Sequence, residues 1–186
     1  VFGDCGSAMR EEDATAPTTP HGRTAVSAEK AIRDLLPDRH LVLRTGWVFA
    51  DDTRHRGAAG RFLRALERGE TVEAAKDRFG QPTYAPDLAE AALELARMGQ
   101  TGTVHCVGPE KHSEFSFARL VAHLLSHDAD LVVGGTGGAD GRPARTWLDR
   151  FQLRSLLGAK AIRTASDGLR AMRDEAAMEP AFARAA

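Results

Sequence analysis

The sequence has 186 residues, of which 42% are hydrophobic and 27% charged, and its net charge is −1. This length suits one domain of ordinary size, and the balanced charge excludes a broad basic surface for nucleic acid. No apolar run approaches the ~20 residues that a membrane helix needs, and the first residues do not resemble a signal peptide. The cysteines, Cys5 and Cys106, form no pattern, which favours a reducing compartment. We therefore expect a cytoplasmic protein that binds neither nucleic acid nor a membrane.

Apolar residues at helical spacing alternate along the chain with short apolar runs that are typical of buried strands. In chain order these patterns predict a loop over residues 3–24, a helix over 27–36, a strand over 40–45, a helix over 58–69, a strand over 71–75, a helix over 82–99, a strand over 102–108, a helix over 113–127, a strand over 130–135, and helices over 149–157 and 166–176. We expect Gly69 and Gly99 to end two of these helices and Ser113 to cap a third. The tail, residues 175–186, is predicted to fray.

Strands that alternate with helices predict an α/β fold with a mainly parallel sheet and right-handed crossovers. We interpret residues 1–186 as a single partial domain. Val1 and Phe2 look like the end of a buried strand, and a domain seldom begins inside a strand. We therefore expect the sequence to be the C-terminal part of something longer, or a truncated product. Such a piece would expose a strand edge and an apolar face, which a second copy of the chain or another partner would cover.

Three local patterns resemble known kinds of functional site. In each case, the spacing or the neighbouring residues argue against that assignment. The glycine-rich stretch Gly134–Gly141 follows an apolar strand, but it lacks the G-x-G-x-x-G spacing of a dinucleotide loop, so we predict a mobile loop. His123 and His127 have the spacing of a zinc pair, but no glutamate follows the first histidine, and we assign both to the polar face of a helix. His105 and Cys106 are neighbours in a predicted strand and point to opposite faces, so we expect Cys106 to be a core residue.

The predicted strand over residues 40–45 ends beside Arg44 and Trp47. Open α/β sheets bind ligands beyond the carboxyl ends of their strands, which makes both side chains candidates. An aromatic residue in this place can stack on a ring or a sugar, or it can fill a gap at the edge of the sheet. The sequence leaves these alternatives open.

Five stretches, taken together and in order, resemble one family over nearly the whole chain. The family is the dTDP-4-dehydrorhamnose reductase group of the extended short-chain dehydrogenases. The stretches are "VFGD" with "EEDATAPTTPHGRTAVSAEKAI", "HLVLRTGWVF", "DRFGQPTYAPDLAEAALEL", "GTVHCVGPEKHSEFSFARLVA", and "GRPARTWLD" with "TASDGLRAM".

The resemblance implies the C-terminal part of a Rossmann-like parallel-sheet domain with a small lobe that binds a sugar nucleotide. It implies NADP(H) as cofactor and hydride transfer to the 4-keto group of a dTDP-deoxysugar. Members of the family use a tyrosine as proton donor, and a lysine four residues later holds the nicotinamide ribose and lowers the pKa of the tyrosine.

This chain departs from the family at both positions, because the tyrosine is His21 and the lysine is Ala25, although Gly22 is retained. An imidazole can donate a proton near neutrality, but it is shorter than a phenol, and a displacement of ~1 Å can cost about a hundredfold in rate. Ala25 offers no charge and no hydrogen bond. The family's glycine-rich cofactor half, about a hundred residues, also has no counterpart in the sequence. These departures argue against cofactor binding by this chain.

From the resemblance and the strand-end geometry, we expect a nucleotide sugar to contact Thr45, Trp47, Thr83 and Arg142, with His21 as the candidate catalytic residue. Our leading hypothesis is a sugar-nucleotide reductase homologue, NADP-linked by family, that is inactive as this isolated chain. The alternative is a non-catalytic sugar-nucleotide-binding or regulatory subunit, for which the family offers a precedent in the regulatory subunit of methionine adenosyltransferase. Epimerase-like or dehydratase-like action is a third hypothesis, although those relatives also rely on the Tyr–Lys pair.

Overall fold

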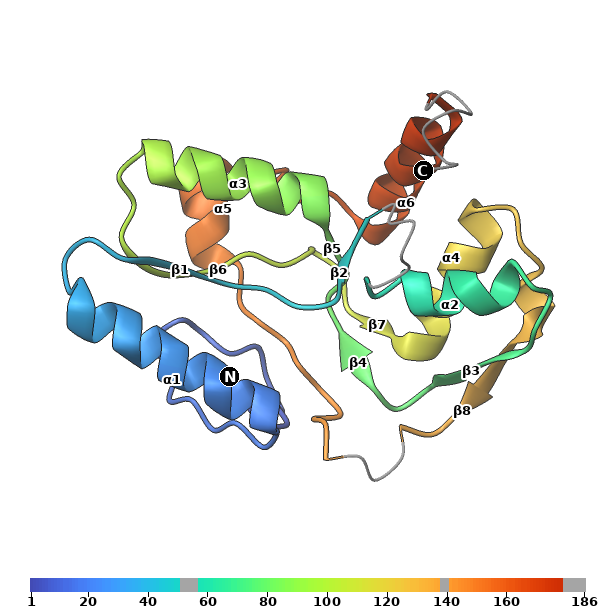
Figure 1. The fold of residues 1–186 in the computed structure, drawn as a ribbon, viewed down its shortest axis with the longest axis horizontal. Helices are drawn as coiled ribbons and strands as arrows, with labels where there is room; N and C mark the ends of the chain where they lie inside the picture. Colours follow the sequence, from blue (N-terminus) through green and yellow to red (C-terminus); the bar gives the residue numbers. More distant parts are fainter. Residues whose placement is uncertain (51–56, 138–140, 179–186) are drawn as a thin grey trace.

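The structure is a computed structural model that describes residues 1–50, 57–137 and 141–178. Helices and strands alternate along most of these ranges, as Figure 1 shows. The elements are α1 (Pro20–Leu35), β1 (Leu41–Arg44), β2 (Val48–Phe49), α2 (Gly60–Leu66), β3 (Val72–Ala75), β4 (Phe79–Gly80), β5 (Thr83–Tyr84), α3 (Ala85–Arg97), β6 (Gly102–His105), β7 (His112–Ser113), α4 (Glu114–Leu124), the 3-10 helix η1 (Ala129–Leu131), β8 (Val132–Gly135), α5 (Phe151–Leu157) and α6 (Ala165–Met178).

Most strand pairs in the described residues are parallel. β1 pairs with β6, β2 with β5, and β3 with β8 in parallel, whereas β4 and β7 pair antiparallel. Each parallel pair joins strands that are far apart in the sequence, and helices lie in the connections between them, as crossover connections require. The predicted α/β fold with a mainly parallel arrangement is therefore confirmed.

The hydrophobic interior forms two clusters, one on each side of the molecule. The larger cluster joins α2, α4 and α6 with β3 and β8, and Phe117 lies fully buried within it. The smaller cluster fills the space between β6, α3 and α5, where Leu95, Leu153 and Cys106 meet. Cys106 is thus a core residue, as expected, and burial raises the pKa of its thiol to about 12.

Capping side chains explain where two of the helices begin. The helix predicted from Ser27 begins at Pro20, because the Thr19 hydroxyl accepts a hydrogen bond from the N–H of Gly22 at 3.0 Å. Pro20 suits the first turn, where its missing N–H is not needed. Ser113 caps α4 as predicted, by accepting a hydrogen bond from the N–H of Ser116 at 3.0 Å.

Other element boundaries also differ from the predicted ones. The strand predicted over residues 102–108 ends at His105, and β5 precedes the helix predicted from residue 82. Gly69 and Gly99 end their helices at positive φ angles of 66° and 68°, as expected. The tail predicted to fray from residue 175 is still helical to residue 178, and residues 179–186 lie outside the described ranges.

The N-terminal loop attaches α1 to the rest of the chain. The N–H of Cys5 donates to the carbonyl of Arg145, and Met9 forms a parallel bridge with Leu148. These contacts hold the start of α1 near the carboxyl end of β1, which is where the candidate site forms. Among the helices of the described residues, none combines the length and the apolar character needed to cross a bilayer.

Candidate functional site

A cavity of about 370 Å³ opens where α1 meets the carboxyl end of β1. Helix α1 contributes His21, Ala25 and Glu29 to its wall. These residues are four apart, so they lie on one face of the helix at successive turns. His21 is exposed, whereas Glu29 is buried at the inner end.

The opposite wall consists of the turn that follows β1. Thr45, Gly46 and Trp47 all line the cavity. Trp47 has a φ angle of 46°, which is rare for a bulky residue and costs energy unless the surroundings enforce it. Its indole lies against Gly80, where an added Cβ would overlap the ring. The site therefore depends on a glycine at position 80 to hold this tryptophan.

The inner end of the cavity contains a buried ion pair. The guanidinium of Arg44 donates from Nε and Nη2 to the two carboxylate oxygens of Glu29, at 2.9 and 2.8 Å. Burial opposes ionisation of Glu29, but the hydrogen bonds from Arg44 and Arg33 outweigh it and hold the pKa of the carboxyl below its usual range. The pair joins α1 to β1, and it fixes the distance between the two walls.

Arg44 has further partners behind this pair. Its Nη1 donates to the carbonyl of Glu11 at 3.3 Å and lies 3.4 Å from Nε2 of His105. The carboxylate of Glu11 in turn accepts the backbone N–H of His105 at 2.8 Å. Burial lowers the pKa of the His105 imidazole, which favours its neutral form. Because His105 is fully buried and does not line the cavity, this network supports the wall from behind.

Trp47 also lines a second cavity of about 240 Å³, beside α2 and α4. Arg61, Arg142 and Glu114 belong to its wall. The guanidinium of Arg61 lies 2.7 Å from the Glu114 carboxylate, and that of Arg78 lies 3.7 Å from it. The Glu114 carboxylate thus holds the guanidinium of Arg61 at the wall of this cavity, and Arg142 adds a second arginine to the wall.

The structure distributes the predicted site residues over these two cavities. His21, Thr45 and Trp47 meet in the first cavity, and Arg142 lines the second. Thr83 lines neither of them and is fully buried. Its N–H donates to the carbonyl of Trp47 at 3.2 Å, and its hydroxyl donates to the carbonyl of Gln81 at 3.1 Å. Thr83 therefore supports the turn behind Trp47.

Glu29 and Arg61 are among the wall residues that sequence reasoning missed. Glu29 had a usable signal, because it continues the four-residue spacing of His21 and Ala25 along one helical face. Arg61 had no signal, because one arginine in a helix rich in charged residues looks like an ordinary surface residue.

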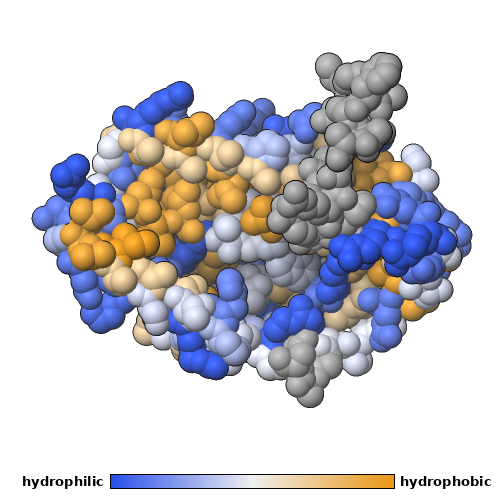
Figure 2. All heavy atoms as spheres, in the orientation of Figure 1, coloured by the Kyte–Doolittle hydropathy of each residue, from blue (hydrophilic) through white to orange (hydrophobic). Residues whose placement is uncertain are grey.

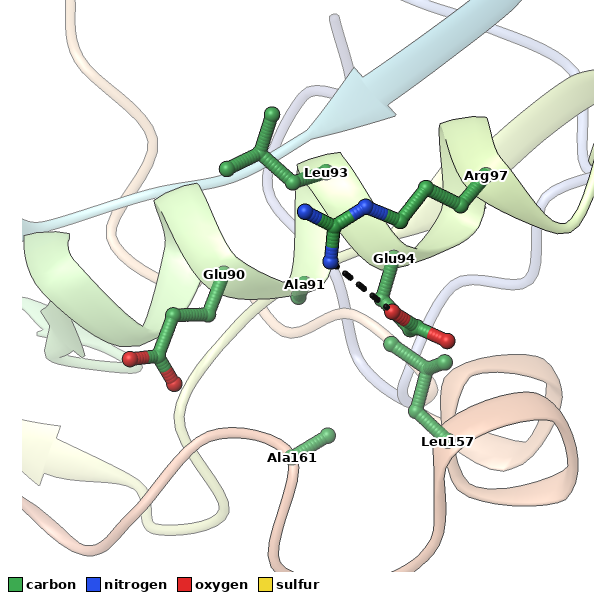
Figure 3. A pocket seen from close by; sticks show the side chains of 7 residues that line it. All are labelled: Glu90, Ala91, Leu93, Glu94, Arg97, Leu157 and Ala161. Carbon is green, nitrogen blue, oxygen red and sulfur yellow. Dashed lines mark ion pairs between the residues drawn. The ribbon is translucent and has the colours of Figure 1, made fainter.

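A larger cavity of about 470 Å³ lies elsewhere, between α3 and α5 (Figure 3). Figure 3 shows Glu94 and Arg97 on its rim, joined by an ion pair at 3.6 Å, while the Leu93 side chain points away from Leu157. This cavity shares no lining residue with the other two, and we do not assign the candidate site to it.

The described residues do not fit the NADP(H) that the resemblance implies. Ala25 ends at its Cβ and offers no hydrogen bond to a ribose. Two described strands lead directly into a helix, β5 into α3 and β7 into α4, and neither junction contains the glycines that let a backbone approach a diphosphate. Of the stretch Gly134–Gly141, the first two glycines end β8, and residues 138–140 lie outside the described ranges.

Metal binding finds no support in the geometry either. Over the described ranges, no three His, Cys, Asp or Glu side chains come together as a metal ion would require. His123 lies in the last turn of α4, and His127 follows the end of that helix.

Comparisons with known proteins identify the family. A family model for the RmlD substrate binding domain matches residues 1–175. A dTDP-4-keto-6-deoxy-D-glucose reductase of Streptomyces niveus is 33% identical over 137 residues, which cover 67% of this chain and 46% of that protein. The chain spans about half the length of several curated relatives that it matches.

Solved structures show the same fold. A dTDP-4-dehydrorhamnose reductase of Clostridium acetobutylicum superposes with a TM-score of 0.82 at 24% identity, over 96% of this chain and 63% of that one. A dTDP-4-dehydrorhamnose reductase of Bacillus anthracis, solved in complex with NADP, also gives 0.82, at 21% identity over 94% of this chain and 62% of that one.

Proposed function

Because the chain belongs to the family of RmlD substrate-binding domains, we propose that it binds a nucleotide sugar across the two cavities that share Trp47. The observation that carries this proposal is the position of Trp47, which lines both cavities at a strained backbone angle. Strain of this kind persists where the surroundings enforce it, and it often accompanies a binding role. The names of the relatives suggest a dTDP-deoxysugar as the ligand.

The chemistry of the two cavities suggests that each one holds a different part of the ligand. The sugar would occupy the first cavity, where the hydroxyl of Thr45 and the imidazole of His21 are available for hydrogen bonds. The diphosphate would occupy the second cavity, where Arg61 and Arg142 supply positive charge in a form that suits phosphate oxygens. The indole of Trp47 would cover the junction between them.

In this proposal the chain binds the nucleotide sugar but does not reduce it. His21 could exchange a proton with a keto oxygen, but the residues around it do not fit NADP(H), so no hydride source is held beside the sugar. This favours the inactive homologue of our leading hypothesis and equally suits the alternative of a binding or regulatory subunit. The two differ in whether another protein responds to the bound sugar.

Calorimetric titration of the purified chain with dTDP-glucose tests the proposal. We expect binding to the wild-type chain and at least a tenfold higher Kd for Trp47→Ala, about 1.4 kcal/mol. Met98→Ala is the matched control, because this large apolar side chain is 50% exposed and lines none of the cavities. Its Kd should equal that of the wild type.

The same samples serve to test catalysis. With NADPH and a dTDP-4-keto-6-deoxysugar, we expect no decrease of absorbance at the nicotinamide wavelength above the rate without protein. Unchanged affinity in Trp47→Ala would show that the proposed site is wrong, and steady NADPH oxidation would show that the non-reducing role is wrong.

A further inference from the structure

A third cavity, which the proposed function does not use, lies beside the start of α5. It has a volume of about 300 Å³, and we call it the α5 cavity. Its wall is lined by Ala8, Gln81, Pro109, Leu148, Asp149, Arg150, Phe151 and Arg154. Gln81 and Leu148 also line the first cavity, so they form a common wall between the two.

Two arginines meet in the α5 cavity without a carboxylate partner. Arg150 and Arg154 are four residues apart, and the positive charge of Arg154 adds to burial in lowering the pKa of Arg150. Within the described ranges, no ion pair joins either guanidinium to an acidic side chain. Among the described residues, the Nη2 of Arg150 reaches only the carbonyl of Ile162, at 3.4 Å, and the buried Nε has no hydrogen-bond partner.

This arrangement contrasts with other arginines of the same chain. Arg44 pairs with Glu29, Arg163 with Asp87, and Arg61 with Glu114. The one carboxylate on the wall of the α5 cavity, that of Asp149, accepts the backbone N–H of Phe151 at 2.6 Å. Two guanidinium groups that repel each other, with an unsatisfied buried N–H, would be stabilised by an anion between them.

An aromatic ring lies beside the two charges. Phe151 follows Arg150 directly, lines the cavity and is 77% exposed. A large exposed apolar ring is costly in water and is suited to stack on a flat ring of a ligand. A volume of about 300 Å³ is at the small end of ligand cavities, which excludes a large cofactor.

We propose that the α5 cavity binds a nucleoside monophosphate, with the phosphate held between Arg150 and Arg154 and the base stacked on Phe151. The site is distinct from the proposed nucleotide-sugar site, because it uses neither Trp47 nor the arginines beside α2. It does not depend on the proposed function, and either can be wrong while the other holds.

Nuclear magnetic resonance titration of the full chain with dTMP tests the proposal, because it locates binding by residue. We expect saturable shifts of the backbone signals of residues 148–154 and of the Arg150 side-chain Nε–H signal. Arg154→Gln should raise the Kd measured at these signals at least tenfold. Arg170→Gln, an exposed arginine on α6 that pairs with Asp167 at 3.0 Å, is the matched control and should leave it unchanged.

Two further ligands distinguish the contribution of the two arginines to the affinity from that of the Phe151 ring. Inorganic phosphate should bind the same residues more weakly than dTMP, and thymidine should not bind at all. Phe151→Ala should reduce the affinity for dTMP to that for phosphate. The proposal fails if dTMP at millimolar concentration leaves residues 148–154 unshifted, if Arg154→Gln binds as tightly as the wild type, or if Phe151→Ala keeps the full affinity for dTMP. The spectra themselves report whether each variant is folded.

Discussion

Glu29 shows how one side chain can decide the geometry of the candidate site. It lies on the same helical face as His21 and Ala25 and lines the same cavity, and both of its oxygens are bound by Arg44. The pair is buried, with side-chain exposures of 7% on both partners. Breaking such a pair leaves one charge buried without compensation, and this cost usually exceeds the net gain of forming the pair.

We therefore expect Glu29→Gln to destabilise the chain by about 3 kcal/mol near neutral pH, measured by urea unfolding. Because the folded-state pKa of Glu29 is depressed, the stability it contributes is present above its unfolded pKa of about 4.3 and is lost as the pH falls through the lower folded value. The variant should therefore lose less stability than the wild type between pH 5 and about pH 3.

Glu70→Gln is the matched control for this experiment. Its carboxylate pairs with Arg68 on the surface, at 2.7 Å with about half of each side chain exposed. Surface pairs contribute little, so this variant should unfold as the wild type does. If Glu29→Gln kept the full acid sensitivity of the wild type, the buried pair would not be the source of that sensitivity.

At the scale of elements, caps decide where the helices of this chain begin. Thr19 and Ser113 both present a hydroxyl to the N–H three residues later, and each is followed directly by a helix. The cap of α4 has the larger consequence for the site, because Glu114 is the first residue of that helix and Phe117 lies one turn further. Both contact the second cavity.

Ser113→Ala should reduce stability by about 1 kcal/mol, because it leaves the N–H of Ser116 without its acceptor. The midpoint of urea unfolding is the measurement. Ser155→Ala is the control, since Ser155 lies exposed inside α5 and its hydroxyl bonds only to a carbonyl of its own helix. It should change stability by no more than about 0.5 kcal/mol. Equal effects of the two substitutions would mean that the cap does not matter.

At the scale of the whole molecule, the surface around α1 and β1 is incompletely covered. In the residues that the structure describes, β1 pairs with β6 on one side alone. Helix α1 leaves Ile32 41% exposed and Leu35 78% exposed, and Leu36, which follows it, is 49% exposed. Figure 2 shows hydrophobic surface on this side, between α3 and α1. An open strand edge next to apolar side chains tends to associate.

We therefore expect the purified chain to self-associate, with an apparent mass that rises with concentration in light scattering coupled to size exclusion. Leu35→Glu should shift the chain toward the monomer, because it places a charge in the apolar surface. Val133→Glu is the matched control, since Val133 is also exposed, at 42%, but lies on β8 in the other part of the molecule. A chain that stays monomeric at all concentrations would contradict this expectation.

Local signals in the sequence were sufficient for much of the secondary structure. The apolar spacing that predicted a helix over residues 82–99 became α3, and the run over residues 40–45 became β1. The cap at Ser113 and the glycine at the end of α3 were also correct. These features are decided by neighbours within one helical turn or one strand, which the sequence displays directly. The two-residue strands β4 and β7 had no such signal, because they form only by pairing with each other.

The sequence alone determined the alternation of helices and strands, and with it the α/β class, because periodicity and caps are local. The tertiary structure decided which side chains share a cavity. It put His21 opposite Trp47, buried Thr83 behind that tryptophan, and brought Arg150 and Arg154 to one cavity, where no ion pair joins either to an acidic side chain of the described residues. Burial and proximity depend on how distant segments pack, and no single segment contains that information.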